Sequence, residues 1–219
     1  MVIRSQFEQQ LQRVRADLLR IAALVEGSCS LAHEALIKRD LVAADKIAPR
    51  DEEIDRLYRQ VTSDCMTILS LQAPVATDLR FLTSLLHISR DLERIGDYAV
   101  EIGQFSTKLF AHPPAPYLPR IETMFNRCQT MLAMSLTALT EMDTEAGQLL
   151  LERDDAVDAD YESVYNSLCH QSYSPGTIEP NLLLLLTVRN LERIADHAAN
   201  IGRRVNYIVT GEPLIISKP

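Results

Sequence analysis

Paired cysteines and long hydrophobic runs are both scarce in this sequence. The strongest apolar run, residues 182–186, is too short to cross a bilayer. The first eleven residues carry polar side chains where a signal peptide needs an apolar stretch, so we expect a cytoplasmic protein without a transmembrane segment. No C-x-x-C pair is present, which excludes a zinc knuckle and a redox motif. We expect the four cysteines to be core residues in a reducing compartment: Cys29, Cys65, Cys128 and Cys169.

The short motifs of common enzymes are also missing. The sequence has no glycine-rich phosphate loop, no G-x-S-x-G elbow and no H-E-x-x-H pattern. No glutamate is followed by histidine three residues later, which argues against a carboxylate-bridged di-iron oxidase. We therefore expect that this chain is not an enzyme.

The charge balance is acidic. Asp and Glu number 30 against 22 Lys and Arg, a formal net charge of −8. This sign opposes binding along a phosphate backbone, so no nucleic acid partner is expected. The apolar content of 47% over 219 residues is sufficient for a sizeable core without disulfides.

Helical periodicity dominates the chain. Apolar residues recur at steps of three and four, and no stretch alternates as a strand would. Pro49 is expected to bend or interrupt the second helical segment. The periodicity predicts an all-α protein with six helices, over residues 7–35, 41–69, 79–109, 121–142, 144–171 and 181–210.

The chain contains an internal repeat. Residues 90–103 align with residues 189–202 and are identical at nine of fourteen positions. A segment with four prolines, residues 111–119, separates the two halves and cannot continue a helix. We predict two tandem, pseudo-symmetric three-helix bundles, with a first repeat at 1–112, a proline-rich linker at 113–119, and a second repeat with a C-terminal tail at 120–219.

Four acidic pairs stand out on the second and third helices of each repeat. Members of a pair are four residues apart, so they lie on the same helical face. Like charges at this spacing destabilise a helix by roughly 0.2–0.5 kcal/mol per pair, and a bound multivalent cation would remove that cost. Carboxylates suit Mg, Mn or Fe ions better than Zn. The candidate metal ligands are Asp51, Asp55, Glu93, Asp97, Asp154, Asp158, Glu192 and Asp196.

An alternative explanation needs no metal. Arg90 and Arg94 lie close enough in sequence to neutralise Glu93 and Asp97 as ordinary surface ion pairs. A duplication copies such pairs as faithfully as it copies ligands, but recurrence of both acidic pairs in both halves favours the metal hypothesis. The histidines have no partner at ligand spacing, and His197 is expected to be an ordinary surface or core residue.

The acidic pairs resemble the duplicated E(D)-x-x-x-D motifs of the PhoU family. The resemblance extends from the first helix to about Glu212 and includes the closing segment, residues 207–212. It implies two similar three-helix bundles with metal ions at the eight carboxylates and no catalytic residues. The metal it implies is a divalent or iron ion, Fe, Mn, Mg or Zn.

The resemblance also implies a function. Members of this family are expected to be cytoplasmic negative regulators of phosphate uptake and of the phosphate-starvation response. They act as metal-binding adaptors between the ATPase subunit of the phosphate ABC transporter and the sensor histidine kinase of the phosphate regulon. Two alternatives stay open: a metal-dependent hydrolase or oxidase built on the carboxylates, and a purely structural helical adaptor without metal. Homodimer formation and peripheral membrane association also stay open.

Overall fold

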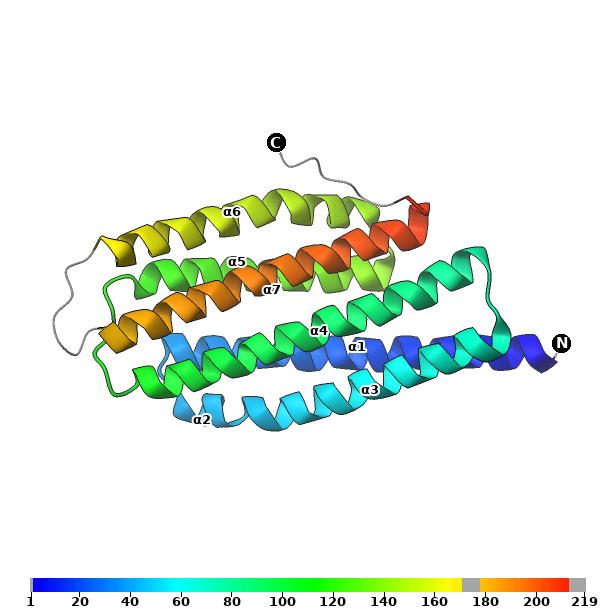
Figure 1. Ribbon diagram of the computed structural model, residues 1–219, viewed down its shortest axis with the longest axis horizontal. Helices are drawn as coiled ribbons and strands as arrows, with labels where there is room; N and C mark the ends of the chain where they lie inside the picture. The colour runs from blue at the N-terminus through cyan, green and yellow to red at the C-terminus, as the bar shows by residue number, and fades with distance from the viewer. Residues whose placement is uncertain (1, 171–177, 213–219) are drawn as a thin grey trace.

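The computed structural model describes residues 2–170 and 178–212, and these residues are helical except for short connections. The all-α prediction is confirmed, with all six long helices present and one short helix added after the first. The helices are α1 (Val2–Ile37), α2 (Leu41–Asp45), α3 (Ile47–Gln72), α4 (Ala76–Leu109), α5 (Leu118–Glu141), α6 (Thr144–Cys169) and α7 (Ile178–Thr210) (Figure 1).

The long helices form two groups of three. Helices α1, α3 and α4 pack together, and so do α5, α6 and α7. The groups join where α4 packs on α7 and where α1 packs on α5. Helices α3, α4, α7 and α6 therefore follow one another across one face of the molecule, with α1 and α5 behind α4 and α7 (Figure 1). The division of the chain at residues 113–119 stays a prediction.

Local sequence explains where several helices begin. The side chains of Asp40 and Asp143 cap α2 and α6, each accepting hydrogen bonds from two backbone N–H groups. Lys46 separates α2 from α3, three residues before Pro49, so the expected interruption is present. The last linker proline, Pro119, is part of α5. It lies in the first turn of α5, where a missing N–H leaves no helical hydrogen bond unmade.

One continuous apolar core runs through both groups of helices. It contains the buried stripe of each long helix and the cysteines Cys29, Cys65 and Cys128. The prediction that all four cysteines are core residues is wrong for Cys169, which is exposed at the end of α6. No helix in the described part of the chain is long and apolar enough to cross a membrane.

Candidate functional site

Asp51 is a half-buried residue on the inner face of α3. Ile47 lies four residues before it and Ile54 three residues after it, and both are buried, so the three side chains share one helical face. The Oδ1 atom of Asp51 is buried and has no hydrogen-bond partner among the described residues. A carboxylate in this environment is costly, because burial removes the water that would otherwise solvate its charge.

Gly96 allows α4 to approach Asp51. A Cβ atom at position 96 would lie 3.2 Å from Asp51 Oδ1 and 3.3 Å from Ile54 Cδ1, closer than most real contacts of this kind. Glycine therefore admits the carboxylate between the two helices. In the second repeat the equivalent residue is Ala195, so the two sites are not copies in detail.

The four acidic residues of the first repeat act on one another electrostatically. Burial, together with the negative charges of Asp97, Asp55 and Glu93, raises the pKa of Asp51 to about 6. Burial also raises the pKa of Glu93, with Asp97 adding to the effect and Arg94 opposing it. Two motifs 42 residues apart in sequence are thus gathered at one place on the α3–α4 pair.

Arginine neutralises part of this charge. Arg94 Nη1 donates a hydrogen bond of 3.1 Å to Asp97 Oδ2, and Arg94 Nε lies 3.7 Å from Glu93 Oε2. The expected pairing with Arg94 is therefore present, whereas Arg90 is exposed and forms no ion pair within the described residues. Burial raises the pKa of Asp97, and Arg94 lowers it in turn.

The second repeat has a similar arrangement on α6 and α7. Asp154 lies in the buried stripe of α6, between Leu150 and Val157, and is only 7% exposed. Burial raises the pKa of Glu192, with contributions from the charges of Asp196 and Asp158. Arg189 Nη1 donates to Glu192 Oε2 at 3.0 Å.

These carboxylates fit a cation chemically. They are hard oxygen donors, and one of them has a buried oxygen that lacks a partner. No three His, Cys, Asp or Glu side chains in residues 2–170 and 178–212 are arranged so that they could hold a metal ion as they stand. Binding would require the side chains to rotate away from Arg94 and Arg189. Such half-exposed ion pairs are typically worth only about 0–1 kcal/mol, so they oppose this rotation weakly. The ligand role of the eight residues stays a prediction.

A polar seam joins α4 to α7 between the two acidic sites. His197 Nδ1 lies 2.8 Å from Asp91 Oδ1, and Asn190 Nδ2 donates to Glu101 Oε2 at 2.8 Å. The ring of Tyr98 lies beside that of His197, with centroids 5.9 Å apart. The spacing of residues along the sequence does not reveal these contacts, although all five residues differ in type from their repeat equivalents.

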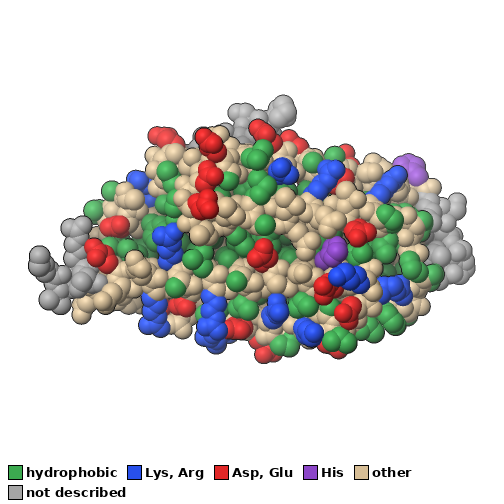
Figure 2. Space-filling view, turned by 180° about the vertical axis from the view of Figure 1, so that it is seen from behind, with side chains coloured by type: hydrophobic (Ala, Val, Ile, Leu, Met, Phe, Trp, Pro, Cys, Tyr) green, Lys and Arg blue, Asp and Glu red, His purple; other side chains and the backbone are tan. Residues whose placement is uncertain are grey.

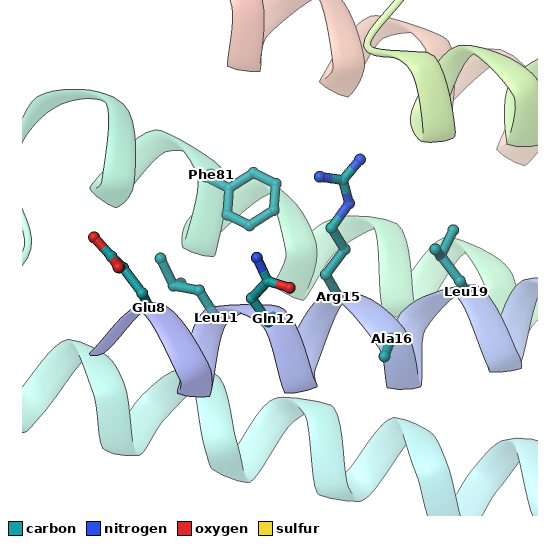
Figure 3. Close-up of a pocket in the computed structure, with 7 residues that line it drawn as sticks. All are labelled: Glu8, Leu11, Gln12, Arg15, Ala16, Leu19 and Phe81. Atoms are coloured by element: carbon teal, nitrogen blue, oxygen red, sulfur yellow. The ribbon is translucent and has the colours of Figure 1, made fainter. Parts of the chain in front are cut away.

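A separate open groove of about 540 Å³ lies between α1 and α4 (Figure 3). The ring of Phe81 from α4 lies over α1, and Arg15 donates to the backbone oxygen of Thr140 on α5 at 3.0 Å. The groove contains one acidic residue and none of the eight predicted ligands. Its lining residues are Glu8, Leu11, Gln12, Arg15, Ala16, Leu19 and Phe81.

Fold and sites together define a class: a duplicated six-helix protein with a cluster of acidic side chains on a helix pair in each repeat. A family model described as "PhoU domain" matches the chain twice, over residues 18–106 and 121–205. This chain belongs to the PhoU family.

Similar proteins are found by sequence and by structure. A phosphate-specific transport system accessory protein PhoU homolog from Synechocystis is 48% identical over 209 residues, covering 95% of this chain and 93% of that protein. The crystal structure of PhoU from Pseudomonas aeruginosa has a TM-score of 0.90 at 31% identity and covers 94% of this chain and 100% of its own. That of the phosphate transport system regulatory protein PhoU from Streptococcus pneumoniae has a TM-score of 0.87 at 27% identity, with coverages of 96% and 100%.

Proposed function

We propose that this chain is a cytoplasmic accessory protein of phosphate transport that represses phosphate uptake and the phosphate-starvation response. It acts as an adaptor between the ATPase subunit of a phosphate ABC transporter and a sensor histidine kinase. The names of its relatives, which describe accessory and regulatory proteins of phosphate transport, support this role. The chain acts through binding and catalyses no reaction.

The observation that carries the metal part of the proposal is the buried Oδ1 atom of Asp51, which has no hydrogen-bond partner among the described residues. A buried carboxylate oxygen without a partner is unfavourable, and a cation would supply one. Asp154 lies at the equivalent place in the buried stripe of α6. Asp51, Asp55, Glu93 and Asp97 would hold metal in the first repeat, and Asp154, Asp158, Glu192 and Asp196 in the second. A bound Fe, Mn, Mg or Zn ion would neutralise each cluster and link the two helices that supply it.

A reporter gene that responds to phosphate starvation tests the proposal in a host lacking its own copy of this protein. We expect the wild-type chain to restore repression when phosphate is plentiful. The variant with all eight carboxylates changed to their amides should lose repression while remaining helical. A control variant, Asp45→Asn with Glu141→Gln, removes exposed charges outside the motifs and should repress normally.

Two results would count against parts of the proposal. Full repression by the eight-residue variant would eliminate the metal mechanism and leave a helical adaptor without metal. Failure of the wild-type chain to repress, or to co-purify with the transporter ATPase subunit and the kinase, would eliminate the adaptor role.

A further inference from the structure

The negative charge of this protein is concentrated on one helix. Helix α6 carries seven carboxylates and one arginine, a formal charge of −6, whereas the whole chain has a net charge of −8. Its repeat equivalent α3 carries five carboxylates and three arginines, a formal charge of −2. Seen from behind the view of Figure 1, much of the surface has acidic and basic side chains interspersed (Figure 2).

Part of this charge forms a stripe on the side of α6 that faces α7. Asp155, Asp158 and Glu162 follow one another at steps of three and four residues, so they share a helical face, and Tyr165 continues it. Asp158 marks this face as the side toward α7, because its charge raises the pKa of Glu192. Asp155 and Glu162 are exposed and form no ion pair with another described residue.

A short apolar stripe lies on α7, which packs against α6. Leu182 is 55% exposed and Leu186 is 48% exposed, and the two are one turn apart. Glu192 marks the side of α7 that faces α6, and His197 marks the side that faces α4. At about 100° per residue, the two leucines lie between these two sides. Tyr165, 42% exposed, adds an aromatic ring from α6.

The repeat shows that this apolar stripe is specific to the second half. The equivalents of Leu182 and Leu186 are Thr83 and His87 on α4. An exposed position is therefore polar in one copy and leucine in the other, although both copies use the same helical face. An exposed pair of leucines on a helix that packs against an acidic helix offers a partner both apolar and charged contacts. Arg189, which follows on the same exposed face of α7, is paired with Glu192.

We propose that this surface of α6 and α7 binds a basic amphipathic helix of a partner protein. Leucines one turn apart match apolar side chains spaced i, i+4 on a partner helix, and lysine or arginine beside them would pair with Asp155 and Glu162. Anionic lipid, nucleic acid and a second copy of this acidic face would all be repelled. The proposal deepens the adaptor function and rests on it for the partner's identity.

Fluorescence anisotropy with a labelled helical peptide tests the proposal directly. The peptide has about five helical turns, with leucine on one face and lysine on the other. The full-length chain is titrated in chelating buffer without the transporter or the kinase, so that the result depends neither on bound metal nor on those partners. We expect Leu182→Gln with Leu186→Gln to weaken binding by about tenfold or more, with helix content and melting temperature unchanged.

Matched controls separate this surface from general attraction between a basic peptide and an acidic protein. Thr83→Gln with His87→Gln changes the equivalent positions of the first repeat and should leave binding unchanged. Asp155→Asn with Glu162→Gln should weaken binding and flatten its salt dependence, because it removes the two screened charges. Asp17→Asn with Glu26→Gln removes the same charge from α1 and should have a smaller effect.

Three outcomes would overturn the proposal. The peptide does not bind, or it binds the leucine variant as tightly as the wild-type chain. Alternatively, the chain binds vesicles of phosphatidylglycerol through Leu182 and Leu186 and ignores the peptide, which would assign the surface to a membrane. Any of these leaves the reporter experiment on phosphate repression to be judged independently.

Discussion

His197 of α7 and Asp91 of α4 form a largely buried pair across the junction of the two repeats, with 2.8 Å between Nδ1 and Oδ1. Each side chain is 15% exposed. The pair joins helices from the two halves at the place where their interface is most extensive. It therefore contributes to the relative position of the two acidic sites, one on each side of it.

Removing the acceptor of this pair should destabilise the fold. We expect Asp91→Ala to lower the free energy of unfolding by about 1–3 kcal/mol, because the imidazole loses its partner in a dry interface. Asp91→Asn keeps an acceptor oxygen and should cost less. Urea denaturation followed by circular dichroism measures both variants, and equal stability of all three proteins would show that the pair contributes nothing.

Asp51 should make the metal-free protein less stable at neutral pH than at acidic pH. Its pKa is raised from the usual 3.8 to about 6, so the folded chain holds this proton more tightly than the unfolded chain. The resulting stabilisation is complete below the unfolded pKa and is lost as the pH rises through about 6. In chelating buffer, the melting temperature of the wild-type protein should fall between pH 5 and pH 7 relative to that of Asp51→Asn.

Asp45→Asn provides the comparison for this measurement, because Asp45 is an exposed carboxylate of α2. It should follow the wild-type pH profile. If Asp51→Asn also follows the wild-type profile, then burial of the Asp51 carboxylate does not determine this part of the pH dependence.

Metal content should depend on the acidic motifs. Elemental analysis of protein purified without chelators or metal-affinity columns should detect Fe, Mn, Mg or Zn, and Glu93→Gln, Asp97→Asn, Glu192→Gln and Asp196→Asn in one chain should remove it. Binding should weaken below pH 6 or so, since protons compete with the cation for Asp51. Metal at 100 times its Kd would stabilise the wild-type fold by about 2.7 kcal/mol. The absence of metal from both the wild-type protein and the variant would contradict the prediction.

Gly147 and Gly27 should respond oppositely to alanine. A Cβ at Gly147 would lie 3.0 Å from the backbone oxygen of Gly202, which cannot move without shifting α7. We expect Gly147→Ala to cost about 1–3 kcal/mol. A Cβ at Gly27 would meet only the flexible guanidinium of Arg50, so Gly27→Ala should be neutral or stabilise α1 by up to about 1 kcal/mol. Thermal unfolding measures the stability of the two variants, and an equal change in melting temperature for both would contradict this prediction.

The sequence contained enough information to predict the helices and the pairing within each acidic motif. Both follow from spacing along a single chain segment, as with Glu93 and Asp97 one turn apart on α4. The place of Asp51 on the inner face of α3 could also be predicted, because it falls at a regular step between Ile47 and Ile54 of the apolar stripe.

Contacts between helices could not be predicted in this way. The approach of Asp51 to Gly96 depends on how α3 and α4 are rotated and offset, which spacing within one helix does not determine. The pairing of Asp91 with His197 has the same origin. The ligand role of the carboxylates is open for a related reason, because it depends on side-chain rotamers that a cation would itself change.

The α4–α7 seam also has a consequence for how the two halves recognise each other. By repeat equivalence, two copies of the first half joined in the same geometry would bring Asp91 of one copy against Glu101 of the other. Asn190 stands where the first half has Asp91, which removes this repulsion, and His197 stands where the first half has Tyr98 and pairs with Asp91. After duplication, the halves have thus become complementary and no longer interchangeable. This complementarity favours pairing of each half with its covalent neighbour over pairing with a second copy of itself.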